Sequence, residues 1–358
     1  AQLIGAPILG RLSDRYGRRP ILLVSIFGTF LGFLLLGFAK TLWMLFASRI
    51  IDGLTGGNMS IAQAYITDVT DSKSRSQGLG MIGAAFGVGF IIGPVAGGVL
   101  SQWGYAVPAL VAAAISLLNL ILVYAWLPES LTAEVREARQ IAAAKPSVSL
   151  SALLTALKRP FSGSLLITRF FFGVSFAILQ TIFSLYALQK FNLTARDTGF
   201  VLTYVGVLSV ITQGFLVGRI SGRVREDKLI VICVGVIALT LLGWGLAPTL
   251  PILLLIMAPN ALAGGMLNTL LSSTLTKSVA PHEVGGILGL SAAIESSTRI
   301  IAPTIGGYLL QQVGTWAPGV FGSIIMLGVF IYVFITLYNH PLVLTFKNEK
   351  SQVHQPGD

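Results

Sequence analysis

Two pairs of opposite charge lie inside long apolar stretches of the chain. Arg49 precedes Asp52 by three residues, and Glu295 precedes Arg299 by four. On a helix, both spacings place the arginine beside the acid on one face. A charge at the centre of a membrane helix costs about 2.5–3.5 kcal/mol on insertion scales, so such residues usually mark ion or substrate pathways. We therefore predict that Asp52 and Glu295 carry protons, assisted by Arg49 and Arg299.

The same four residues could instead form structural ion pairs that only fix helix packing, and both interpretations remain open at the level of the sequence. A fifth charge, Arg169, lies a turn or two inside its apolar stretch. Because a long arginine side chain there can extend to the lipid headgroups, we predict no role for Arg169 in proton transfer.

The elements that carry these charges are expected to be membrane helices. Of the 358 residues, 54% are hydrophobic and 11% are charged, against about 25% charged in soluble proteins. A helix that crosses a bilayer needs about 20 apolar residues. The pattern predicts an all-α membrane protein with segments near 1–10, 20–39, 42–67, 77–100, 105–127, 162–188, 198–218, 228–247, 250–276, 284–310 and 316–339.

The formal net charge of +10 is explained by the loops. Between the predicted segments, nearly all lysines and arginines fall on one side, and the other side holds Lys40, Lys190 and Arg196. This asymmetry predicts that the first side, with the C-terminus, is cytoplasmic in a cell membrane. We therefore expect contact with lipid and no nucleic-acid partner. A single cysteine, Cys233, excludes an intramolecular disulfide, and we predict no metal and no cofactor.

Two stretches of sequence recur at nearly the same interval. GRLSDRYGRR at 10–19 returns as GRISGRVRED at 218–227, which is 208 residues later, and GPVAGG at 93–98 returns as APTIGG at 302–307, which is 209 residues later. The chain thus contains two copies of one unit. We predict an N-terminal bundle at 1–127, a cytoplasmic linker at 128–160, a C-terminal bundle at 161–345 and a cytoplasmic tail at 346–358.

The first copy also looks incomplete. The second copy begins near Phe161, and the position 208 residues earlier would lie before residue 1. We therefore expect that helix 1 and part of helix 2 of a twelve-helix parent are missing from this chain, so that residue 1 lies within helix 2.

Four motifs follow one another along the chain. They are the loop with Gly10, Asp14, Arg15, Gly17, Arg18 and Arg19; the segment Arg49–Gly53; the helix with Gly80, Gly89, Gly93, Pro94, Gly97 and Gly98; and the segment Leu127–Ser130. These motifs resemble those of the major facilitator superfamily, and most closely those of its drug:proton antiporters of the tetracycline-efflux type, so we call the third motif the antiporter helix. The resemblance implies two pseudo-symmetric six-helix bundles.

The loop motif can be interpreted physically. Gly10 would allow two helices to approach closely, Gly17 would allow a tight reversal, and the arginines would anchor the loop on the cytoplasmic side. We expect Asp14 to meet the positive N-terminal end of the 284–310 helix and Asp68 to pair with Arg18. The resemblance implies that such contacts latch the outward-open state; alternatively, the loop only sets orientation.

In the antiporter helix, Gly89, Gly93 and Gly97 fall on one face and would form a smooth groove for a neighbouring backbone, while Pro94 would bend the helix. The resemblance ties this motif to antiporters and to limiting leak.

A substrate would contact polar or adaptable side chains at mid-depth. Arg49, Asp52, Met59 and Gln63 share one face if 42–67 is a single helix. The candidates for the substrate cavity are Asn58, Met59, Gln63, Gln180, Gln213 and Asn268.

Together, the charges and the resemblance indicate a proton-coupled secondary transporter, not an enzyme, that exports amphipathic drug-like molecules by alternating access. We expect it to act as a monomer on a small-molecule substrate and protons. Two alternatives stay open: a proton symporter or facilitator of a metabolite such as a sugar, and a non-transporting receptor or scaffold on the same fold.

Overall fold

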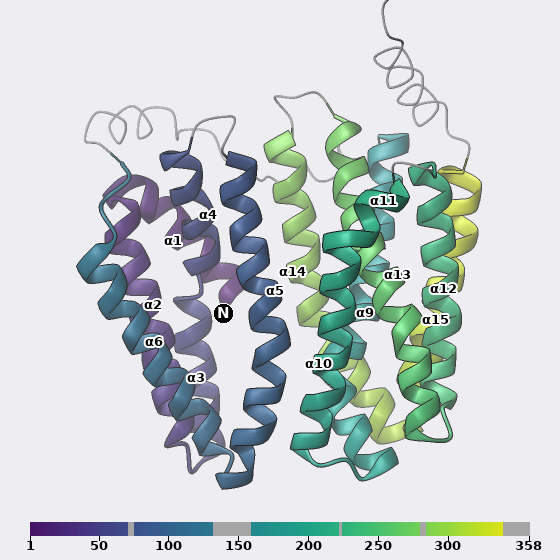
Figure 1. Ribbon diagram of the computed structural model, residues 1–358, viewed down its shortest axis with the longest axis horizontal. Coiled ribbons are helices and arrows are strands. Elements are labelled where there is room, and N and C mark those ends of the chain that lie inside the picture. The colour runs from purple at the N-terminus through teal and green to yellow at the C-terminus, as the bar shows by residue number, and fades with distance from the viewer. Residues whose placement is uncertain (71–74, 132–158, 222–223, 280–283, 339–358) are drawn as a thin grey trace, which may run out of the picture. The chain divides into compact units, whose positions relative to one another are not determined.

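A computed structural model describes residues 1–70, 75–131, 159–221, 224–279 and 284–338, and all regular secondary structure in these ranges is helical. The helices group into two compact units (Figure 1). Most of the predicted linker, 128–160, and all of the predicted tail, 346–358, lie outside the described residues.

The first unit is built around one central helix. It contains α1 (Gln2–Tyr16), α2 (Arg18–Gly37), α3 (Leu42–Leu54), α4 (Asn58–Val69), α5 (Arg75–Leu100), a short turn (Ser101–Trp103) and α6 (Ala106–Trp126). Residues Ala195–Thr203, the first part of α10, also belong to it. Helix α2 packs against α6 along its length and also against α3, α4 and α1 (Figure 1).

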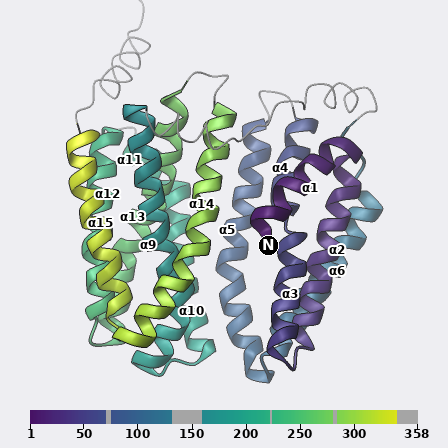
Figure 2. The ribbon, with the colours of Figure 1, turned by 180° about the vertical axis from the view of Figure 1, so that it is seen from behind.

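The second unit holds the remaining helices. These are α9 (Pro160–Phe191), α10 (Ala195–Ile211) from Tyr204 onward, a π-helical turn (Thr212–Leu216), α11 (Val217–Ser221), α12 (Glu226–Leu246), α13 (Leu250–Lys277), α14 (Val284–Tyr308), a second π-helical turn (Leu309–Val313) and α15 (Ala317–Thr336). Figure 2 shows α12 and α15 side by side. They can approach closely because glycines face each other: a Cβ on Gly319 would lie 2.6 Å from the Cα of Gly245.

Seven helical stretches in the described ranges are long and apolar enough to cross a membrane: Arg18–Gly37, Ala106–Trp126, Phe161–Phe191, Ala195–Ile220, Glu226–Leu246, Leu250–Lys277 and Ala317–Thr336. The predicted segments 1–10, 42–67, 77–100 and 284–310 are helical but are not among these seven. Helix α1 continues to Tyr16, beyond the predicted end of the first segment.

The prediction of one continuous helix over 42–67 is wrong, because the chain breaks after Leu54. The hydroxyl of Thr55 donates to the carbonyl of Ile51 at 2.8 Å, and Gly56 and Gly57 follow. Glycine adds no side chain to hold a helical conformation and lowers helix stability. The carbonyl that the break releases, that of Thr55, accepts a hydrogen bond from the hydroxyl of Ser25 on α2. The break therefore leaves this polar group satisfied, as a membrane interior requires.

Close packing between α2 and α3 fixes the position of Asp52. A Cβ on Gly32 would lie 2.8 Å from the Cβ of Asp52, so only glycine leaves room for that side chain. Nearer the N-terminus of α2, Leu22 and Ile26 are buried with Leu9 of α1 and Ile61 of α4. Burial of this apolar cluster helps to hold α2 as the support against which Asp52 lies.

Candidate functional site

Asp52 and Arg49 form an ion pair in the last two turns of α3. Arg49 Nη1 lies 3.4 Å from Asp52 Oδ2, and the Asp52 side chain is 27% exposed. The guanidinium also lies over the ring of Phe33, 5.4 Å from its centroid. Because α3 ends two residues after Asp52, the partial negative charge of the helix end lies on one side of the carboxylate and the guanidinium on the other. A small movement of Arg49 would change the electrostatic surroundings of the Asp52 carboxylate.

Glu295 of α14 contacts two arginines. Glu295 Oε1 lies 3.1 Å from Arg299 Nη2, four residues along the same helix, and Glu295 Oε2 lies 3.3 Å from Arg169 Nη2 on α9. The Glu295 side chain is 44% exposed in the described structure. The predicted Glu295–Arg299 pair is therefore present, and a second guanidinium joins it.

The prediction that Arg169 extends away to the lipid headgroups is wrong. Its side chain is only 13% exposed, and besides contacting Glu295 it donates from Nη1 to Ser272 Oγ on α13 at 3.0 Å. Ser272 in turn donates to the carbonyl of Asn268. Spacing along the chain could not reveal this, because Glu295 is 126 residues from Arg169; the only signal was a charge inside an apolar stretch.

Arg18, in the first turn of α2, lies at the centre of a second cluster of charges. It is bonded to Asp68 Oδ2 of α4 at 2.9 Å and to Asp14 Oδ1 of α1 at 2.7 Å. The side chains of Arg18 and Asp68 are each 6% exposed, and Arg18 Nη1 also donates to Ser13 Oγ. The expected contact between Arg18 and Asp68 is thus present, and it joins three helices of the first unit.

A carboxylate that the sequence did not single out, Glu129, completes this cluster. It accepts hydrogen bonds from the backbone N–H groups of Arg18 at 2.8 Å and Arg19 at 3.1 Å. These are among the free donors at the start of α2, where an anion is stabilised by the helix dipole. Glu129 is thus a helix-end acid at α2, whereas the contact expected between Asp14 and the start of the 284–310 helix stays a prediction. The position of Glu129 in the Leu127–Ser130 motif was the available signal.

The two glycines of the loop motif behave differently. Gly17 has φ 109° and ψ 155°, a conformation that other residues rarely adopt, so it makes the predicted reversal between α1 and α2. The close approach predicted for Gly10 is not seen among the described residues: apart from its own neighbours along the chain, none of them lies within 4 Å of a Cβ at this position. Close approach occurs instead at Gly57, where a Cβ would lie 2.9 Å from the Cβ of Leu9.

The antiporter motif lies on α5, and its glycines also differ. A Cβ on Gly89, Gly93 or Gly97 would meet none of the described residues within 4 Å, so these three leave an open strip. Gly98 is buried, and a Cβ there would lie 2.8 Å from the carbonyl oxygen of Ala195, which belongs to the same unit. Gly80 and Pro94 both lie within α5, which continues through Pro94 to Leu100.

The six substrate-cavity candidates are all exposed within their units: Asn58, Met59, Gln63, Gln180, Gln213 and Asn268. The shared face predicted for Arg49, Asp52, Met59 and Gln63 does not hold as one helix face, because α3 and α4 are separate helices. Gln213 lies in the π-helical turn Thr212–Leu216, and such turns often occur at functional sites.

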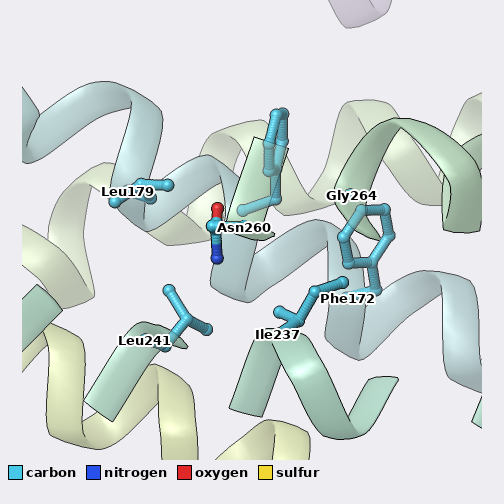
Figure 3. Close-up of a pocket in the computed structure, with 7 residues that line it drawn as sticks. Phe172, Leu179, Ile237, Leu241, Asn260 and Gly264 are labelled. Atoms are coloured by element: carbon cyan, nitrogen blue, oxygen red, sulfur yellow. The ribbon is translucent and has the colours of Figure 1, made fainter. Parts of the chain in front are cut away.

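A pocket in the second unit was not predicted. It is lined by Phe172, Phe176, Leu179, Ile237, Leu241, Asn260 and Gly264 (Figure 3). It has no room for a water molecule, and the Asn260 amide already donates to Thr240 Oγ1 at 2.8 Å. We therefore interpret the pocket as a packing gap beside an amide that already has a hydrogen-bond partner, and not as a ligand site.

The second unit carries a counterpart of the Arg18–Asp68 pair with reversed charges. Glu226 lies 208 residues after Arg18 and Lys277 lies 209 residues after Asp68, the same intervals as the repeat. Lys277 Nζ is 2.5 Å from Glu226 Oε1, and Thr274 Oγ1 donates to Glu226 Oε2 at 3.0 Å. Each unit therefore joins two of its helices with one ion pair at the equivalent position.

Beside it, Asp227 is only 1% exposed and binds the guanidinium of Arg225 through both oxygens, at 2.6 and 3.0 Å. The hydrogen bond with Asp227 raises the pKa of Arg225 above its ordinary value. The buried carboxylate is thus paired with a permanent positive charge.

We predict that reversing the second pair is tolerated only when both charges are exchanged. Glu226→Lys or Lys277→Glu alone should lower stability by about 1 kcal/mol, since the pair is partly exposed, and the double exchange should recover most of this loss. Thermal unfolding of the purified variants measures the loss of stability and its recovery. Exchanging Arg18 and Asp68 is the matched control and should not recover, because Arg18 also binds Asp14 and Ser13. Equal losses in all three second-unit variants would contradict the pairing.

Comparison with known proteins shows to which family the chain belongs. The family model described as Major Facilitator Superfamily matches residues 1–303 and, in a second match, residues 165–356. The chain belongs to the major facilitator superfamily. Its fold is accordingly that of a multi-pass membrane transporter of small molecules and not that of an enzyme.

Relatives in this superfamily match nearly the whole chain. The class H tetracycline resistance protein of Pasteurella multocida is 33% identical over 349 residues, covering 95% of this chain and 84% of that protein. Solute carrier family 22 member 18 of Mus musculus is 31% identical over 358 residues, covering 98% and 86%. The crystal structure of the human organic anion transporter MFSD10 is similar in fold, with a TM-score of 0.67 and 24% identity over 93% of this chain and 80% of that one.

Proposed function

We propose that this major facilitator is a proton-coupled antiporter that exports amphipathic, drug-like molecules across the cell membrane by alternating access. The observation that carries the proposal is the Asp52–Arg49 pair, held at a helix end in the middle of the predicted segment 42–67. The names of the tetracycline resistance relatives support export of a drug-like molecule.

Asp52 is the stronger of the two proton candidates. It has one guanidinium partner at 3.4 Å, and its partner is itself 47% exposed and free to change position. When the carboxylate is protonated, Arg49 loses its ion pair but keeps the ring of Phe33, so the arginine is not left without a favourable contact. Glu295 with Arg299 is a second proton candidate; loss of its charge would leave two guanidiniums without their shared acid.

The test is transport by the protein in proteoliposomes with an imposed pH gradient, screened against a panel of amphipathic compounds. The expected result is uphill movement of at least one compound, driven by protons moving in the opposite direction and abolished by a protonophore. Movement of substrate and protons in the same direction would favour the symporter of a metabolite. Transport that equilibrates the compound without responding to the pH gradient would contradict proton coupling.

We further propose that the loop motif gates the transporter, with Asp14, Arg15, Arg18, Arg19 and Asp68 stabilising the outward-open state and Gly10 and Gly17 shaping the loop. Asp14→Asn removes the negative charge that pairs with Arg18. We expect this change to shift the population of transporter molecules toward the inward-open state. Single cysteines introduced on either side, in a Cys233→Ala background, would report the shift as a change in labelling rate. Unchanged labelling from both sides would reduce the loop to an orientation signal.

The antiporter helix is proposed to limit leak through the transport path, with Gly80, Gly89, Gly93, Pro94, Gly97 and Gly98 as its residues.

Of the substrate-cavity candidates, Asn268 is supported by its link through Ser272 to Arg169, and Gln213 by its position in a π-helical turn. Asn58, Met59, Gln63 and Gln180 rest on their exposure alone.

A further inference from the structure

The cluster formed by Arg169, Glu295 and Arg299 carries an excess positive charge. Two guanidiniums share one carboxylate, and the sequences of α9, α13 and α14 contain no other acid. The Arg49–Asp52 pair of the first unit, by contrast, is balanced one to one. An unbalanced cation inside an apolar segment is costly, and a negative group brought beside it would remove that cost.

The ion pairs of this cluster are also long. Glu295 lies 3.1 and 3.3 Å from its two arginines, whereas bonds between guanidinium and carboxylate usually measure about 2.7–2.9 Å. The arginine pairs at the helix ends show tighter distances, 2.7 and 2.9 Å from Arg18 to its two acids and 2.6 Å from Arg225 to Asp227, whereas the Arg49–Asp52 pair, at 3.4 Å, is also long. Glu295 therefore holds each guanidinium loosely, and a further acceptor can compete for them.

Hydrogen-bond donors remain for such an acceptor. A guanidinium carries five N–H donors, yet with the described residues Arg169 and Arg299 together make three hydrogen bonds, two to Glu295 and one to Ser272. Arg169 Nε is buried and has no hydrogen-bond partner among the described residues. A buried donor without a partner costs free energy, so the cluster is poorer in acceptors than in donors.

We propose that this cluster binds the negative group, a carboxylate or sulfonate, of an amphipathic anionic substrate. Arg169 and Arg299 supply the charge, and Glu295 keeps the two guanidiniums together when the site is empty. The proposal deepens the proposed function, on which it rests for the existence of a small-molecule substrate, by naming the class of that substrate. Positive guanidiniums also argue against a cationic drug at this position, since like charges repel.

The test compares two dyes with the same ring system and opposite charge, fluorescein and rhodamine 123, binding to purified protein in an uncharged detergent. Fluorescence polarisation at one pH and without a gradient gives both dissociation constants. Arg299→Gln removes the excess charge and should weaken fluorescein binding about tenfold, with little effect on rhodamine 123. Glu295→Gln adds to the excess charge and should tighten fluorescein binding about threefold or more.

The matched control is Lys190→Gln, which removes the same charge from the far end of α9 and should change neither constant by more than about twofold. Arg299 is exposed, so its variant is expected to fold, and thermal unfolding checks this. Parallel losses for both dyes in Arg299→Gln would overturn the proposal, because a purely structural role affects both. Weaker fluorescein binding in Glu295→Gln, or no preference for fluorescein in the unaltered protein, would overturn it as well.

This experiment and the proteoliposome test fail separately. If export does not respond to a pH gradient but the dye preference follows the charge of the cluster, the results contradict proton coupling and support the anion site. If export is proton-driven but the dye preference does not follow the charge of the cluster, the results contradict the anion site and support the antiporter.

Discussion

Asp52→Asn is expected to reduce pH-gradient-driven export to the level of empty proteoliposomes while exchange of labelled for unlabelled substrate continues. Asparagine keeps the size of the side chain beside Gly32, where space is tight, but it cannot take up or release a proton. A variant that no longer binds protons can still pass between its two conformations with substrate bound, so exchange measures whether folding and substrate binding survive. Parallel assays of uphill export and exchange separate the two effects.

Asp52→Glu is the matched control, because it keeps an ionisable carboxylate within reach of Arg49 and should retain part of the uphill export. Arg49→Lys keeps a positive charge but loses the planar group that lies over Phe33, and an intermediate loss is expected. Full uphill export by Asp52→Asn would remove Asp52 from proton coupling and leave Glu295 as the candidate.

Arg18→Gln is expected to cause the largest loss of stability of any single change in the loop cluster, about 3–5 kcal/mol. Arg18 and Asp68 are almost fully buried and bonded at 2.9 Å, and the variant leaves Asp68 buried without that guanidinium. Breaking a buried ion pair by removing one partner is costly because the remaining charge is still buried and has lost its attraction to that partner. Thermal unfolding in detergent, compared with the unaltered protein, measures the loss.

Arg15→Gln is the control for this variant. Arg15 belongs to the same loop and carries the same charge, but it is exposed and lies over the neighbouring ring of Tyr16, so its removal should change stability by less than about 0.5 kcal/mol. The double variant Arg18→Met, Asp68→Leu removes both buried charges and should recover only the part of the loss that comes from an unbalanced Asp68, because the contacts of Arg18 with Asp14 and Ser13 stay lost. Equal shifts for Arg15→Gln and Arg18→Gln would show that burial of the pair is not what stabilises this end of the unit.

Composition and local spacing were sufficient for the features that depend on neighbours along the chain. The helical membrane class follows from apolar stretches of spanning length, and the pairs Arg49–Asp52 and Glu295–Arg299 follow from helical spacing. The reversal at Gly17 follows from the conformations that glycine alone adopts readily. In each case the physical cause acts within a few residues.

Most features that depend on contacts between distant segments could not be predicted in this way; the Arg18–Asp68 pair, 50 residues apart, was the exception. The partners of Arg169 lie on α13 and α14, and Glu129 reaches the start of α2 across more than a hundred residues of chain. The break after Leu54 was missed for a related reason: Thr55, Gly56 and Gly57 are tolerated inside membrane helices, and the hydroxyl that reaches the released Thr55 carbonyl, that of Ser25, lies 30 residues away along the chain.

The hold of Glu129 on the first amides of α2 ties two helix ends together. The chain leaves α6 at Trp126, and three residues later the Glu129 carboxylate binds the start of α2. The end of α6 and the start of α2 are therefore joined by this carboxylate as well as by the packing of the two helices, so a change at Glu129 is expected to disturb the Arg18 cluster without altering any residue of the loop motif.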